Sequence, residues 1–122
     1  MIVRLVLWPL TLIIYASWPL KAWEWGAFWG VIFIRPEHRD YEPIHAHELQ
    51  HARQFWRWLG FGFMVLYTLS RTWRLRFEAE AYRAQLACVP FPDQQRYVYA
   101  DMLVKNYDLN INMAEALAAL EG

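Results

Sequence analysis

The spacing of apolar and polar residues predicts helices over most of the chain after residue 42. His, Leu and aromatic side chains recur at helical spacing between Pro43 and Gly60. Proline suits the first position of a helix and glycine the position just after its end, so a helix is predicted over 43–59. The next stretch, 60–69, is apolar but too short to cross a bilayer, and it predicts a buried connector or a short helix.

A second long helix is predicted to begin near Ser70 or Thr72 and to reach Cys88. Either hydroxyl can accept a hydrogen bond from the first helical turn, and the proline-rich run that follows ends the helix. Two shorter helices are predicted after it, over 94–105 and 112–120.

The residues before Pro43 have a different pattern. Beta-branched and aromatic residues over 29–34 predict one short strand or hairpin, and the polar stretch 37–42 predicts a loop. These elements together predict a mainly α (α+β) fold. All 122 residues are expected to form a single domain, because no repeat, low-complexity tract or linker interrupts the chain.

The N-terminal segment 1–24 is apolar and rich in tryptophan. From Ile2 to Leu20 its clearly polar side chains are one arginine, one threonine and one serine, without a polar stripe at helical spacing. We therefore expect the segment to be buried, either in protein or in lipid. Its length is borderline for a spanning helix, whereas tryptophans at its end suit a membrane interface. Membrane contact through this segment is thus an open alternative to packing inside the protein or against a second copy.

Composition and charge exclude several classes of protein. Hydrophobic residues make up 57% of the chain and aromatic residues 18%, which is enough for a core and excludes disorder. Twelve basic residues balance twelve acidic ones, so no nucleic-acid partner is expected. Cys88 is the single cysteine, which excludes an internal disulfide and a zinc site of paired thiolates, and we expect it to be an inert core residue.

The strongest chemical signal is the sequence H-E-x-x-H inside the predicted helix 43–59. Residues four apart lie about 40° apart around a helix axis, so His47 and His51 project from one face and can bind one zinc ion. Glu48 is not needed as a ligand. Its carboxylate can instead act as general base on a zinc-bound water.

A catalytic zinc site needs a third protein ligand, and two carboxylates on the predicted helix 72–88 compete for this role. Glu78 shares a helix face with residues expected to point inward, and a buried carboxylate needs a partner such as a metal ion. Glu80 lies on the opposite side, with Arg76 and Arg83 at the spacing of exposed ion pairs. We therefore expect Glu78 to be the ligand and Glu80 a solvated ion-pair residue.

Other polar side chains are expected to have ordinary roles. His45 lies about 160° from His47 around the helix and cannot share its metal, while His38 lies in a loop. Tyr67 and Tyr82 could donate to a developing oxyanion, although seven tyrosines give no reason to choose one. A solvated helix face is expected for Arg53, Arg57, Arg71 and Arg74.

These motifs resemble those of the gluzincin metallopeptidases, in which a second helix after H-E-x-x-H carries a glutamate ligand. The strings HELQHARQ and FEAEAYRAQ, joined by an apolar connector, are similar to very short gluzincin-like proteins of bacterial and phage genomes, over roughly residues 29–107. The resemblance implies a zincin-like helical domain. It also implies that His47, His51 and Glu78 bind Zn(II), with Glu48 as general base.

The resemblance has one departure and one further implication. Many gluzincins carry an aspartate four residues after the glutamate ligand, where it orients the first histidine, and this position is Tyr82 here. A phenol cannot supply that charge.

In the family a strand edge beside the active helix holds the substrate in extended form, and 29–34 is the expected counterpart.

We therefore predict a zinc-dependent metallopeptidase that hydrolyses a peptide or protein substrate in the cytoplasm, with membrane association through 1–24 left open. The alternative is a non-catalytic, zinc-stabilised protein that docks to a membrane or a partner. A further hypothesis is that segment 1–24 or 108–122 restricts access to the site.

Overall fold

The computed structural model describes residues 2–7, 10–16, 25–28 and 31–122. The strands are β1 (Ile2–Leu7), β2 (Leu10–Tyr15), β3 (Trp25–Phe28) and β4 (Val31–Ile34). A short 3-10 helix, η1 (Pro36–His38), follows the strands. The α-helices are α1 (Glu42–Arg57), α2 (Phe61–Leu69), α3 (Arg71–Leu86), α4 (Pro92–Lys105) and α5 (Met113–Glu121).

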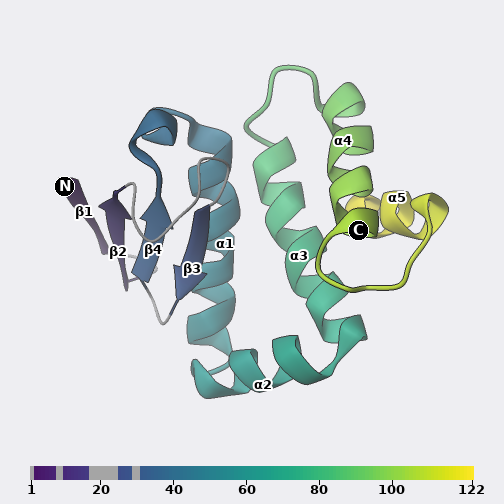
Figure 1. Ribbon diagram of the computed structural model, residues 1–122, viewed down its shortest axis with the longest axis horizontal. Helices are drawn as coiled ribbons and strands as arrows, with labels where there is room; N and C mark the ends of the chain where they lie inside the picture. The colour runs from purple at the N-terminus through teal and green to yellow at the C-terminus, as the bar shows by residue number, and fades with distance from the viewer. Residues whose placement is uncertain (1, 8–9, 17–24, 29–30) are drawn as a thin grey trace.

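Strands and helices occupy separate parts of the molecule (Figure 1). The sheet lies on one side, and α1 packs against one of its faces. Helix α2 crosses one end of the molecule, α3 returns beside α1, and α4 and α5 pack on the far side of α3. The fold is mainly α (α+β), as predicted.

The described strands form one mixed sheet in the order β1-β2-β4-β3. The pairs β1–β2 and β3–β4 are antiparallel, whereas β2 and β4 are parallel. Alternate residues of β2 and β4 are buried on the face that meets α1, as a strand's period of two requires. Together with the first turn of α1 they form a small core. The buried residues of this core are Ile13, Tyr15, Ile32, Ile34 and Ile44.

The sheet is larger than the one short strand or hairpin predicted over 29–34. Part of the N-terminal apolar segment forms β1 and β2, and β1 is not buried, because Val3, Leu5 and Leu7 are exposed. The expectation of full burial is therefore wrong for β1. A strand with apolar residues on both faces lacks the alternation that would have identified it.

Most of the tryptophans behind the expected membrane contact of segment 1–24 lie outside the described residues. Positions 17–24 and 29–30 belong to this part, so the structure does not test that expectation. Within the described ranges, no helix has both the length and the apolar character of a membrane span.

The end of α1 is determined by a glycine, as the sequence predicts for 43–59. Gly60 has a φ of +67°, a left-handed conformation that L side chains rarely adopt. A Cβ at this position would lie 2.6 Å from the Phe55 ring, so the space is also closed. Glycine therefore allows the sharp change of direction from α1 into α2.

The stretch 60–69 forms the short helix α2, but it is not buried. None of the nine residues of α2, all of which the structure describes, is buried, and Phe61 and Leu69 are strongly exposed. Of the two alternatives predicted for this stretch, the short helix is confirmed and the buried connector is wrong. One side of α2 packs against α3, and the other side exposes its apolar residues to solvent.

Helices α3, α4 and α5 enclose a second core. Its buried residues are Tyr82, Leu86, Tyr99, Ala100, Leu103, Leu109, Ala116 and Leu120. Ser70 caps α3 by accepting a hydrogen bond from the Trp73 amide, and Asn112 and Glu115 form the predicted capping box of α5. Cys88 lies beyond the end of α3 and is exposed, so its prediction as a core residue is wrong.

Arg74 also differs from its prediction as a solvated side chain. Its guanidinium donates to the carbonyl oxygens of Tyr67 and Thr68, which belong to the last turn of α2, and to those of Tyr107 and Asp108. Arg74 thus ties the end of α2 to the loop before α5. Arg53, Arg57 and Arg71 are exposed, as predicted.

Both terminal segments contribute to the cores. The segment 1–24 supplies Ile13 and Tyr15, and the segment 108–122 supplies Ala116 and Leu120. Deleting either one to relieve an inhibitory contact would therefore destabilise the fold.

Candidate metal centre

The packing of α1 against α3 brings together the three side chains expected to bind a metal. His47 and His51 lie one turn apart on α1, and Glu78 lies on the facing side of α3. Oε1 of Glu78 is 3.4 Å from Nε2 of His47 and 3.1 Å from Nε2 of His51. Each residue offers one ligand atom, and these atoms all lie within 4.8 Å of one another. We call this group the His47–His51–Glu78 cluster.

The cluster is deeply buried, with exposed fractions of 2%, 8% and 3% for His47, His51 and Glu78. A buried carboxylate without charge compensation is costly. Two imidazoles and one carboxylate are a donor set that suits a divalent metal of the zinc type, and three protein ligands leave a fourth position open. The residues present therefore fit a metal ion that would replace the hydrogen bond between His51 and Glu78.

Gln54 orients His51 and was not singled out from the sequence. Its Oε1 lies 2.8 Å from Nδ1 of His51, and its Nε2 donates to the carbonyl oxygen of Phe77 at 2.8 Å. Gln54 is fully buried. The available signal was its position three residues after His51, which places a polar side chain on the same helix face.

His47 lacks the corresponding partner. Its Nδ1 is buried without a hydrogen-bond partner among the described residues. Tyr82, at the position of the family's aspartate, packs its ring against the imidazole, with 4.4 Å between ring centroids. The Tyr82 hydroxyl instead pairs with that of Tyr107 at 2.6 Å. The tyrosine at position 82 thus packs against His47 without supplying a hydrogen bond to its Nδ1, and the polar contact of this histidine is the one from Nε2 to Glu78.

Tyr67 on α2 contacts the cluster from a third helix. Its hydroxyl donates a hydrogen bond to Oε2 of Glu78, the carboxylate oxygen not shared with the histidines. Burial opposes the charge on Glu78, but His51 and His47 outweigh it and hold the carboxyl pKa well below its usual range. Glu78 is therefore an anion with both oxygens engaged.

Glu48 lies beside the cluster, within range of the charges of His47, His51 and Glu78. It is 3% exposed, and its Oε2 makes no hydrogen bond within the described part of the chain. Burial raises the pKa of its carboxyl, and the charge of Glu78 adds to this, whereas His47 and His51 oppose it. A free buried oxygen with a raised pKa is suited to accept a proton.

Glu80 does not bind at the cluster, as predicted, but its predicted partners are wrong. Its carboxylate accepts hydrogen bonds from Gln50 and Gln54 and lies 3.9 Å from Arg57, all on α1. Arg76 lies over the Trp73 ring, and Arg83 donates to the carbonyl oxygen of Ala119. Glu80 thus joins α3 to α1 instead of pairing along its own helix.

His45 stays away from the cluster, as its helix position predicts, but it is not an ordinary surface residue. It is buried, with Nε2 2.8 Å from the Tyr15 hydroxyl and Nδ1 2.8 Å from the carbonyl oxygen of Tyr41. It joins α1 to the sheet. The remaining histidine, His38, ends η1 and is half-buried.

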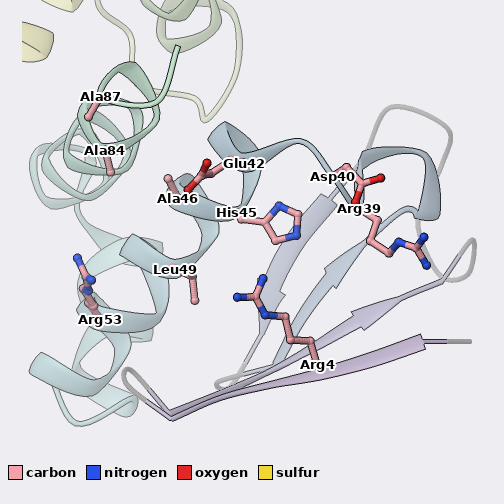
Figure 2. A pocket seen from close by; sticks show the side chains of 10 residues that line it. All are labelled: Arg4, Arg39, Asp40, Glu42, His45, Ala46, Leu49, Arg53, Ala84 and Ala87. Atoms are coloured by element: carbon pink, nitrogen blue, oxygen red, sulfur yellow. The ribbon is translucent and has the colours of Figure 1, made fainter. Parts of the chain in front are cut away.

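His45 also lines a hollow of about 510 Å³ on another face of α1 (Figure 2). Arg4 of β1 points into this hollow, and Ala84 of α3 and Ala87 just after it line the opposite side. None of the three clustered residues lines it. The hollow is therefore separate from the candidate metal centre.

The expected substrate strand is misplaced. β4 lies between β2 and β3, so both of its edges are already paired and it cannot accept an extended peptide. The described sheet has its edges at β1 and β3, and β3 is the edge that also contacts α1. The expectation for 29–34 is wrong because the strand order was not visible in the sequence.

Comparisons with models of protein families, with curated proteins and with solved structures found no match.

Proposed function

We propose that this protein is a zinc-dependent metallopeptidase. One observation carries the proposal, namely that H-E-x-x-H lies on a helix whose two histidines meet a glutamate from another helix within 4.8 Å, with Glu48 buried beside them. Because α1 and α3 bring these groups together from distant parts of the sequence, chance occurrence of the motif is a weaker explanation. The proposal agrees with the resemblance to gluzincins.

The donor set favours zinc over harder ions. Imidazole nitrogen suits zinc, copper, iron and nickel, whereas magnesium and calcium prefer oxygen ligands throughout. Two histidines and one glutamate are also the protein ligands found in catalytic zinc sites with an open position. His47, His51 and Glu78 would hold the ion.

Each residue then has a distinct task. When bound, zinc supplies Lewis-acid chemistry that acidifies a water molecule and polarises a carbonyl group. Glu48 would accept the proton from the attacking water at its free Oε2 and return it to the nitrogen of the leaving amine. Gln54 and Tyr67 would keep His51 and Glu78 in position.

The sheet edge beside α1 supports a proposal for the substrate class. An extended peptide can add to β3 through main-chain hydrogen bonds, which recognise a peptide backbone without regard to its sequence. A peptide or protein substrate is therefore proposed.

The test combines metal content with hydrolysis of a mixed peptide library by the full chain loaded with zinc. Glu48→Gln should abolish hydrolysis while leaving zinc content and the circular dichroism spectrum unchanged. Glu80→Gln is the matched control on α3 and should keep both activity and zinc. Equal hydrolysis by the wild type and Glu48→Gln would overturn the proposed mechanism.

The burial of the cluster favours a second candidate function. With exposed fractions between 2% and 8%, the three residues have little contact with solvent, as in a site that joins two helices for stability. This candidate is a zinc-stabilised protein without catalysis. Zinc bound at one ion per chain, with no hydrolysis of any library peptide, would favour it over the peptidase.

A further inference from the structure

Helix α2 presents an apolar face to solvent that nothing in the described structure covers. Phe61, Val65 and Leu69 follow one another at four-residue intervals, so they lie along one side of the helix. Their exposed fractions are 70%, 41% and 80%, and that of Leu59 just before the helix is 88%. We call these four residues the α2 apolar face.

The opposite side of α2 is fully used within the protein. Phe63 packs against Phe77 of α3, with 4.8 Å between ring centroids, and Tyr67 donates to Glu78. The inner side therefore makes the aromatic and hydrogen-bond contacts with α3, whereas Phe61 and Leu69 on the outer side leave most of their surface exposed. Large exposed apolar patches of this kind mark surfaces that bind a partner or a membrane.

Leu59 adds an independent observation. It has a φ of +55°, a left-handed conformation that is unfavourable for a bulky residue, and it is almost completely exposed. Glycine or asparagine would suit this backbone better, and leucine gains no packing there in return. A strained and exposed leucine is explained if its side chain is buried in something outside the chain.

The sequence on either side of α2 carries basic residues and no acidic ones. Between residues 49 and 77 the chain contains five arginines and no carboxylate, although the whole protein has as many acidic as basic residues. Arg57 and Arg71 lie at the two ends of α2, with side chains 61% and 57% exposed. Their partners Glu80 and Asp108 are 3.9 Å away, which is the range of weak surface pairs. Positive charge therefore flanks the apolar face on both sides.

Trp56, in the last turn of α1, is an exposed aromatic residue close to Leu59, whose amide donates to its carbonyl oxygen. It is 41% exposed, and its indole nitrogen donates to the carbonyl oxygen of Leu10 at 2.9 Å. This bond brings Leu10 of β2 next to the end of α1, and Leu10 and its partner Leu7 on β1 are 51% and 78% exposed. Exposed apolar residues of β1 and β2 thus lie near the end of α1 that leads into α2.

We propose that α2 and its flanks dock onto an anionic membrane surface, with the α2 apolar face inserted among the acyl chains and Arg57 and Arg71 at the headgroups. An exposed apolar helix face with basic and aromatic flanks has the features of an interfacial helix, which lies in the plane of the membrane. A nine-residue helix is too short to span it. A second copy fits less well, because a two-fold contact would bring arginines of both copies together.

The test is flotation of the full-length protein with vesicles of phosphatidylcholine alone and of phosphatidylcholine with about one third phosphatidylglycerol. Binding is expected to the anionic vesicles, at least about tenfold weaker to the neutral ones, and reduced by added salt. Phe61→Ser and Leu69→Ser should each weaken binding by about tenfold. Phe91→Ser is the matched control, because Phe91 is 66% exposed but lies before α4, and it should change nothing.

The charge contribution is tested in the same assay. Arg57→Gln and Arg71→Gln should each weaken binding to anionic vesicles by about fivefold, whereas Lys105→Gln on α4 should not. The proposal is overturned if the wild type fails to bind anionic vesicles, or if Phe61→Ser and Phe91→Ser bind equally well. It is also overturned if sedimentation shows a dimer in lipid-free buffer that Phe61→Ser dissociates, because a second copy then covers the face. The readout does not depend on zinc or hydrolysis.

Discussion

Oε1 of Gln54 lies 2.8 Å from Nδ1 of His51 in the buried contact between α1 and α3. Because the Gln54 amide nitrogen donates to the Phe77 carbonyl oxygen, the amide is oriented with its oxygen toward the imidazole. This arrangement favours the tautomer of His51 with its proton on Nδ1 and leaves Nε2 for a metal.

Gln54→Ala is therefore expected to lower the affinity for zinc by about 10-fold to 100-fold, since a residue that orients a metal-binding histidine contributes on this scale. Isothermal titration with zinc measures it. Gln50→Ala is the matched control on the same helix, because Gln50 bonds to Glu80 and should leave the affinity unchanged. Equal affinities of the two variants would show that the Gln54 contact does not matter for metal binding.

Zinc is expected to raise the melting temperature, because one ion would join α1 to α3. At a free concentration of 100 times Kd, binding to the folded state alone adds about 2.7 kcal/mol to its stability. Differential scanning fluorimetry with zinc and with a chelator measures the shift. Glu78→Ala should abolish the shift and Glu80→Ala should keep it. A shift that survives Glu78→Ala would point to a different zinc site.

Zinc binding is expected to release a proton from His51 at pH 7.5. Burial lowers the pKa of this imidazole, but the Glu78 carboxylate outweighs burial and raises the pKa to about 9 from its ordinary 6.5. In the metal-free protein His51 therefore holds its proton up to about pH 9, and zinc must displace it.

The affinity for zinc should then rise with pH between about 7 and 9, by up to tenfold per pH unit. Titration calorimetry in two buffers of different ionisation enthalpy counts the protons released. In the metal-free protein a rise in pH has the opposite effect, because it lowers the free energy of unfolding instead of strengthening zinc binding. The contribution of His51 to stability is complete below pH 6.5 and is lost as the pH rises through about 9. An affinity that stays flat above pH 7 would contradict the raised pKa.

Two tyrosine variants separate a role at the metal centre from a role in the core. Tyr67→Phe removes the hydroxyl that donates to Glu78 and should weaken zinc binding by about tenfold. Tyr82→Phe removes the bond to Tyr107 and should lower the free energy of unfolding by about 1 kcal/mol without changing zinc affinity. Zinc titration and urea unfolding of both variants give the comparison. If Tyr82→Phe weakened zinc binding and Tyr67→Phe did not, the orienting role would belong to Tyr82.

The sequence by itself determined the helices and most of the candidate metal centre, because the relevant signals are local. Pro43 and Gly60 predict the bounds of α1 to within two residues, since they act on the backbone where they stand. The convergence of His47 and His51 follows from the helical repeat alone. The inward position of Glu78 follows from the apolar residues on its own helix face.

Tertiary structure decided which faces meet, and this changed the remaining predictions. Gln54 and Tyr67 became part of the candidate metal centre because α3 and α2 pack beside α1, and Glu80 contacts its partners across a helix interface. The N-terminal strands were missed because both of their faces are apolar, so no period of two was visible. Strand order and helix packing depend on contacts between residues far apart in the chain, and a local pattern of hydrophobic positions carries no information about them.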